Sequence, residues 1–242
     1  MAAITEVRIF ESTENVYDAI AHEILKLTQE STQEIFDIAL SGGNSPKGLF
    51  NHISENFAKS IPWERIHFWW GDERCVSPYD EQSNYKMTFD LLLSKIDIPS
   101  RNVHRIKGEE DPVKEAERYS KEMEETLNSR GKDPVFDIIL LGLGDDGHTA
   151  SIFPDQLELF EYKDCCSVTQ HPLSGQKRIT ITGNVLNNAN RIFFLVTGSN
   201  KSIRVSEIMN DSEAAKLLPA YYISPQNGEV IWFLDEAAAS KI

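Results

Sequence analysis

Short apolar runs alternate along this chain with longer amphipathic stretches, and this alternation constrains the fold more than any other feature. The runs FDIILL (136–141) and IFFLV (192–196) are almost continuously apolar, which is typical of strands buried on both faces of a sheet. Alternating strand and helix patterns favour a mostly parallel central sheet flanked by helices on both faces. The sequence therefore predicts a Rossmann-like α/β fold, and no linker divides residues 1–242 into more than a single domain.

The individual elements follow from the period of the apolar residues. Candidate strands are 7–10, 34–40, 65–70, 103–106, 136–141, 178–182, 191–196 and 230–234. Candidate helices are 13–29, 46–59, 84–93, 112–129, 199–209 and 235–240. The helix 112–129 has the clearest ends, because Asp111 can cap it, Pro112 suits the first helical position and Gly131 lies just beyond it. The segment 155–175 has the least regular pattern, and we expect a packed loop there.

The charge balance excludes several classes of partner. Lys and Arg number 24 against 38 Asp and Glu, so the formal net charge is −14. Nucleic acids and anionic lipids both attract clustered basic residues, so neither is an expected partner. No secretory signal is visible in MAAITEVRIF, and no apolar run approaches the roughly 18 residues of a membrane span. Cys75, Cys165 and Cys166 lack the spacing of a zinc site, so we expect reduced thiols and a cytoplasmic protein.

In an open α/β sheet, ligands bind at the carboxyl ends of the strands, so the residues that follow each strand are informative. After strand 34–40 comes Ser41-Gly42-Gly43-Asn44-Ser45-Pro46 and then a helix. The two glycines let the backbone approach a ligand closely, and a helix N-terminus favours an anion such as phosphate. A tight turn capped by Ser41 or Asn44 is the structural alternative.

Three charged residues, Asp72, Glu73 and Arg74, follow strand 65–70. Charges at the end of a buried strand are expected on the rim of the crevice. The Arg74 guanidinium suits a phosphate, while Asp72 can accept from a sugar hydroxyl or hold Arg74 in place. A local ion pair on a solvated turn is the competing interpretation.

The third loop, after strand 136–141, reads Gly142-Leu143-Gly144-Asp145-Asp146-Gly147-His148. It contains the letters of a G-x-G-x-x-G dinucleotide fingerprint, but Asp145 and Asp146 would repel a pyrophosphate there, and a lone match is weak. His148 is better suited to function, because histidine gains or loses a proton near its ordinary pKa of about 6.5. Asp146 can orient its ring, a pairing that suits general acid–base catalysis, whereas a lone histidine more often fills a turn.

Two later segments supply positive charge. Arg178 begins the strand RITIT, and Lys201 follows the strand IFFLV in the first turn of a helix. Lys is mildly unfavourable in a first helical turn because of the helix dipole, which favours a ligand role for Lys201 over a surface position.

Together, the segments LSGGNSPKGLF, FWWGDERCV, LLGLGDDGHTASIFP, RITIT and FLVTGSNK resemble the 6-phosphogluconolactonases, within a group that also includes glucosamine-6-phosphate isomerase/deaminase. The matching segments run in order from about residue 40 to residue 201. The resemblance implies hydrolysis of 6-phospho-D-glucono-1,5-lactone to 6-phosphogluconate, the second step of the oxidative pentose phosphate pathway. It implies no cofactor and no metal, and the oligomeric state stays open.

The resemblance also implies roles for residues of this chain. Phosphate or its neighbouring hydroxyls would be held by Gly42, Gly43, Asn44, Ser45, Arg178 and Lys201, while Asp72 and Arg74 would line the sugar pocket. His148 would be the general base, with Asp146 beside it. Amides of the loop 142–147 or a cationic side chain could stabilise the charge that develops on the carbonyl oxygen.

Other functions are weighed against this one. The amino-sugar deaminases of the group carry a glutamate before the proline of the D-G-H loop, where this chain has Phe153 before Pro154. A phenylalanine cannot transfer protons, so the deaminase interpretation weakens. A dehydrogenase would bind NAD, and a non-catalytic sensor would bind 6-phosphogluconate without turnover.

Overall fold

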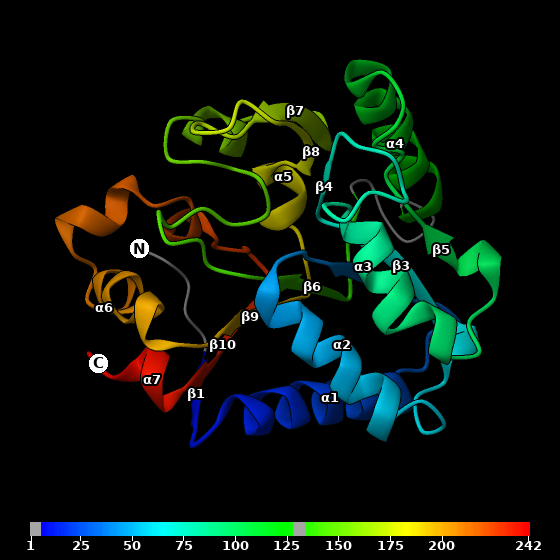
Figure 1. The fold of residues 1–242 in the computed structure, drawn as a ribbon, viewed down its shortest axis with the longest axis horizontal. Coiled ribbons are helices and arrows are strands. Elements are labelled where there is room, and N and C mark those ends of the chain that lie inside the picture. Colours follow the sequence, from blue (N-terminus) through cyan, green and yellow to red (C-terminus); the bar gives the residue numbers. More distant parts are fainter. Residues whose placement is uncertain (1–5, 128–133) are drawn as a thin grey trace.

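The computed structural model describes residues 6–127 and 134–242, and within them a parallel sheet of seven strands forms the centre of the molecule (Figure 1). The strand order is β1-β10-β9-β6-β2-β3-β5, and every neighbouring pair is parallel. These strands are β1 (Glu6–Phe10), β2 (Phe36–Leu40), β3 (Ile66–Trp70), β5 (Val103–His104), β6 (Ile138–Leu141), β9 (Arg191–Val196) and β10 (Glu229–Asp235). The predicted α/β class is confirmed.

Helices surround this sheet and cover its apolar strands. They are α1 (Thr13–Glu30), α2 (Asn44–Asn56), α3 (Asn84–Leu91), α4 (Pro112–Leu127), α5 (Gly183–Leu186), α6 (Ser202–Met209) and α7 (Glu236–Ala239). In α1, Val16, Ile20 and Ile24 recur at a spacing of four residues and are all buried, so one stripe of the helix faces the core. Every side chain of β2 and β6 is buried, as expected for central strands covered on both faces.

A second, antiparallel sheet was not predicted. It has the order β4-β8-β7 and joins β4 (Asp72–Arg74), β8 (Lys177–Ile181) and β7 (Cys166–Gln170). The predicted strand 178–182 therefore lies outside the central sheet, and β7 lies inside the segment 155–175 where only a loop was expected. Figure 1 shows this small sheet, with α5, on the opposite side of the molecule from α1.

Most predicted boundaries agree with the structure to within a few residues. Asp111 caps α4 through a hydrogen bond from the Lys114 N–H at 3.1 Å, as predicted. The predicted end of that helix at Ser129 and the stop at Gly131 lie outside the described residues. The predicted helix 199–209 divides into a 3-10 turn (Ser199–Lys201) followed by α6.

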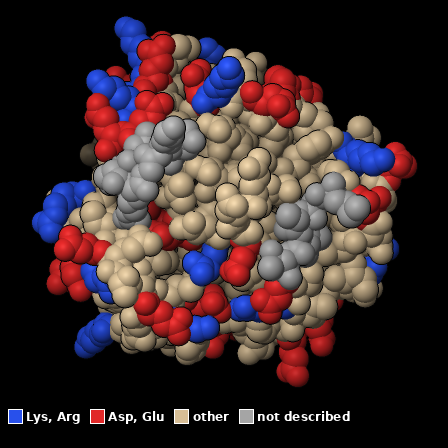
Figure 2. Space-filling model, turned by 180° about the vertical axis from the view of Figure 1, so that it is seen from behind, with Lys and Arg blue, Asp and Glu red and all other residues tan. Residues whose placement is uncertain are grey.

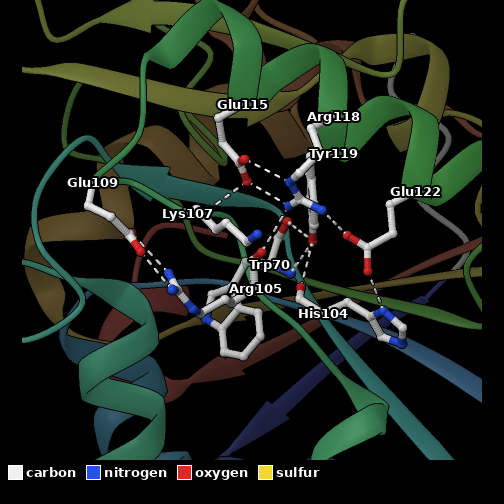
Figure 3. A network of polar contacts seen from close by, with 9 residues as sticks. All are labelled: Trp70, His104, Arg105, Lys107, Glu109, Glu115, Arg118, Tyr119 and Glu122. Carbon is white, nitrogen blue, oxygen red and sulfur yellow. Dashed lines mark hydrogen bonds and ion pairs between the residues drawn. The ribbon is translucent and has the colours of Figure 1, made fainter.

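A polar network anchors α4 to the end of β3 (Figure 3). The buried Tyr119 hydroxyl accepts from the Trp70 N–H at 2.9 Å and lies 3.2 Å from the carbonyl oxygens of Trp70 and His104. Burial raises the pKa of Tyr119 well above its ordinary value, so the phenol keeps the proton it donates. Glu122 of α4 pairs with His104 of the edge strand β5 at 2.7 Å. The network thus fixes the carboxyl end of β3, immediately before Asp72.

The face of the molecule opposite to Figure 1 carries charge mainly around its margin. There, Lys and Arg side chains stand among Asp and Glu side chains, and the middle is largely uncharged (Figure 2). Among the described residues, no helix is both long enough and apolar enough to cross a membrane.

Candidate active site

A pocket of about 530 Å³ opens at the carboxyl ends of the central strands. Because parallel strands end at one edge of a sheet, the loops that follow β2, β3, β6 and β9 meet there. Nine of the ten predicted site residues line this pocket, namely Gly42, Gly43, Asn44, Ser45, Asp72, Arg74, His148, Arg178 and Lys201. The tenth, Asp146, contacts the His148 ring.

The loop between β2 and α2 forms one wall. Gly43 adopts a φ of +101°, which side-chain-bearing residues rarely take, and a Cβ on Gly42 would lie 1.9 Å from the Asn84 side chain. No side chain caps the N-terminus of α2, so its first N–H groups remain open to an anion, and the predicted cap by Ser41 or Asn44 is wrong. The buried Ser41 hydroxyl also has no hydrogen-bond partner.

The charged residues after β3 divide between two tasks. Glu73 does not lie on the pocket rim as expected; it is buried and accepts hydrogen bonds from the N–H groups of Asn84 and Tyr85 at 2.7 and 2.8 Å. Burial raises the pKa of Glu73. Asp72 does face the pocket, but its partners are Ser151 and Arg178 rather than Arg74. Arg74 instead donates to the Gln82 carbonyl oxygen at 2.6 Å.

His148 and Asp146 form the pair that the sequence predicted. The Asp146 Oδ1 atom lies 2.6 Å from His148 Nδ1 and also accepts the His148 backbone N–H at 3.0 Å. Burial alone would raise the pKa of Asp146, but its hydrogen bonds with His148 and the charge of that ring outweigh burial and lower the pKa to about 2. Asp146 is therefore a carboxylate at neutral pH.

The amides of the same loop are less available than expected. The Gly144 N–H donates to the His148 carbonyl oxygen at 2.8 Å, and the Gly147 N–H donates to the Gly144 carbonyl oxygen at 3.0 Å. Both hydrogen bonds hold the turn that presents His148. The expectation that these two amides stabilise a carbonyl oxygen is wrong, because each already has an acceptor within the loop.

The cationic residues approach the pocket from different elements. Arg178 lies on β8, in register with Arg74 of β4, so two guanidinium groups share one wall. Lys201 comes from the turn after β9 and forms an ion pair with Asp145. Asp235, at the end of β10, accepts the Gly198 N–H at 3.0 Å and thereby fixes this turn.

Two buried residues behind the pocket were not identified from the sequence as site residues. The Ser151 hydroxyl donates to Asp72 Oδ2 at 2.5 Å, and the Phe153 ring lies 4.9 Å from the His148 ring and 5.4 Å from the Arg178 guanidinium carbon. Their position in the TASIFP segment, directly after His148, was the only signal in the sequence. A serine and a phenylalanine in such a segment suggest packing unless their neighbours are known.

The fold and the pocket together define a ligand-binding α/β protein that gathers a histidine, carboxylates and cationic side chains at the carboxyl edge of its sheet. A family model described as glucosamine-6-phosphate isomerases/6-phosphogluconolactonase matches residues 11–232. The chain belongs to this family.

Individual relatives agree with this membership. A 6-phosphogluconolactonase of Treponema pallidum is 43% identical over 197 residues, which cover 81% of this chain and 82% of the relative. One of Haemophilus influenzae is 40% identical over 230 residues, covering 95% and 96%.

Solved structures share the fold. The devB protein has a TM-score of 0.92 at 42% identity and covers 98% of this chain and 99% of its own. The 6-phosphogluconolactonase of Thermotoga maritima has a TM-score of 0.82 at 30% identity, covering 95% and 99%. A monomeric glucosamine-6-phosphate deaminase, at 19% identity and a TM-score of 0.81, shares the fold.

Proposed function

We propose that this pocket hydrolyses 6-phospho-D-glucono-1,5-lactone to 6-phosphogluconate, with His148 as the general base. The reaction is the one named for the relatives that are 40–43% identical to this chain, and it belongs to the oxidative pentose phosphate pathway. The chain is accordingly a lactone hydrolase. We place it in the cytoplasm, where its three free cysteines would stay reduced.

One observation carries the role of His148. Since Asp146 is a carboxylate, it can only accept, and its oxygen at 2.6 Å requires the proton of a neutral His148 ring to sit on Nδ1. The lone pair of the ring then lies on Nε2. His148 lines the pocket and is partly exposed, so Nε2 is the nitrogen available to a water molecule there.

The substrate phosphate needs compensation in a chain of net charge −14. The open N-terminus of α2, the loop from Gly42 to Ser45, and Lys201 line the same pocket. Arg74 and Arg178 add two guanidinium groups, each with a buried Nε that lacks a hydrogen-bond partner. Such donors favour a polyanionic, hydroxylated ligand, since a buried polar atom without a partner costs free energy.

The chemical steps follow from this arrangement. The anchored phosphate places the lactone carbonyl beside His148, which takes a proton from water as the water oxygen bonds to C1. The tetrahedral intermediate then collapses, the bond between C1 and the ring oxygen breaks, and His148 returns the proton to that oxygen. The products are a carboxylate and a free hydroxyl. General-base catalysis of this kind typically contributes about 10²–10⁴-fold in rate.

The deaminase interpretation finds no support in the side chains of the pocket. Phe153 is fully buried and packs against the His148 ring, so the position of the deaminase glutamate holds a group without a titratable proton.

The test is hydrolysis of freshly generated lactone near pH 7, with the spontaneous rate subtracted. Wild-type turnover is expected, and His148→Ala should lower kcat by about 10²-fold or more with a smaller effect on KM. Near-normal kcat in the variant would exclude His148 as the base. Absent wild-type turnover, ammonia release from glucosamine 6-phosphate would indicate a deaminase, and binding of 6-phosphogluconate without turnover would indicate a sensor.

A further inference from the structure

Asp72 and Arg178 are two opposite charges, buried side by side, that do not touch. Asp72 is 4% exposed and Arg178 is 9% exposed, yet Asp72 Oδ2 lies 4.0 Å from Arg178 Nη1. A buried carboxylate and guanidinium usually meet in a direct, often bidentate hydrogen bond of about 2.7–2.9 Å. The gap therefore needs a cause.

The Ser151 hydroxyl occupies that gap. It donates its single proton to Asp72 Oδ2 at 2.5 Å and accepts from Arg178 Nη1 at 3.2 Å. Ser151 is fully buried, and its own N–H donates to Thr180 Oγ1 at 3.1 Å, which fixes the serine against β8. The hydrogen bonds thus run in one direction, from arginine to serine to aspartate.

The opposite side of Arg178 is also supported. Its guanidinium carbon lies 5.4 Å from the centre of the Phe153 ring, within the range of a cation–π interaction. Burial lowers the pKa of Arg178, which shows how little of its charge is compensated within the protein. With Nη1 held by Ser151 and Nε unpartnered, most of its donors remain for a ligand.

We propose that Ser151 is a positioning residue that keeps Asp72 and Arg178 apart, so that both remain able to bind substrate. Without the hydroxyl, the two charges would close into a direct ion pair and neutralise each other. The arginine would then be lost to the anionic part of the substrate, and the aspartate to its hydroxyls. The consequence for catalysis rests on the proposed function, whereas the separation of the two side chains does not.

Ser151→Ala is the direct test. KM for the lactone should rise about tenfold or more, as expected when a charged hydrogen-bonding group is lost to the ligand, while kcat changes by less than about threefold. Calorimetric titration with 6-phosphogluconate should show a similar loss of affinity. Ser167→Ala on β7 is the matched control, because Ser167 lies opposite Thr180 in the same sheet and its hydroxyl contacts only the Val168 carbonyl oxygen.

A simple loss of folding would be recognised by urea unfolding, since the proposal expects Ser151→Ala to be at least as stable as the control. In the Asp72→Asn background, adding Ser151→Ala should leave KM unchanged, because an amide cannot neutralise Arg178. An equal increase in both backgrounds would overturn the proposal.

A crystal structure of Ser151→Ala separates this inference from the proposed function. Direct contact between Asp72 and Arg178 would support the spacer even if the lactone proved not to be the substrate. Side chains that stay 4 Å apart in the variant would refute it even if the enzyme were a lactonase.

Discussion

Replacing Asp146 by asparagine would separate the geometric role of this residue from its charge. One oxygen of Asp146, Oδ1, accepts both the His148 ring proton and the His148 backbone N–H. An asparagine can place its amide oxygen at the same point. The backbone N–H selects that orientation, because the alternative would put an amide NH₂ against another donor. Asp146→Asn should therefore keep His148 in the productive tautomer while removing the negative charge.

The magnitude follows from the change in acceptor. A hydrogen bond to a charged group contributes about 1.5–3 kcal/mol against roughly 0.5–1.5 kcal/mol for a neutral one. The Asp146 side chain is 42% exposed, so solvent screening reduces the difference to about 1 kcal/mol. Since about 1.4 kcal/mol changes a rate tenfold, kcat should fall by roughly five- to tenfold. Asp146→Ala leaves both N–H groups without their acceptor and should cost about 10²-fold.

The assay is steady-state lactone hydrolysis of both variants, with the spontaneous rate subtracted. KM should change little, because Asp146 does not line the pocket. The carboxylate favours the protonated ring, so its removal should move the acid limb of the kcat/KM profile to lower pH. The reasoning fails if Asp146→Ala retains wild-type kcat, or if the asparagine variant is as impaired as the alanine variant.

Three further predictions concern the phosphate wall and acid stability. Lys201→Ala and Arg178→Ala should each raise KM strongly in lactone kinetics, and unchanged KM in both would remove them from the phosphate site. Gly42→Ala should destabilise the protein by about 1–3 kcal/mol in urea unfolding and raise KM, because its Cβ would lie 1.9 Å from the Asn84 side chain; an unaffected variant would mean that Asn84 moves freely. The lowered pKa of Asp146, about 2 against 3.8, should stabilise the fold above about pH 4, and this contribution should disappear as pH falls through 2. The difference in unfolding free energy between wild type and Asp146→Asn should narrow over that range, and a constant difference would contradict it.

The central sheet and the location of the site could be predicted from the sequence. Continuous apolar runs such as 192–196 can only be buried strands, and parallel strands bring the loops that follow them to one edge. The convergence of Ser45, Asp72, His148 and Lys201 follows from that rule and from the order of the segments along the chain.

The antiparallel sheet could not be predicted in the same way. Its strand β4 has three residues, all charged, and β7 mixes buried and partly exposed side chains over the sequence CSVTQ. Neither shows an apolar period of its own. They become strands because β8 supplies their hydrogen-bonding partners from elsewhere in the chain, pairing Arg74 with Arg178.

The sequence by itself determined the fold class, the edge of the sheet that binds ligand, and the pairing of Asp146 with His148, because each depends on residues close together in the chain. Tertiary structure alone decided which polar groups stay available. It consumed the Gly144 and Gly147 amides within their turn, buried Glu73 as an acceptor for α3, and inserted Ser151 between Asp72 and Arg178. The physical reason is that hydrogen-bond partners are set by distances of a few tenths of an ångström between segments up to a hundred residues apart, which no local pattern encodes.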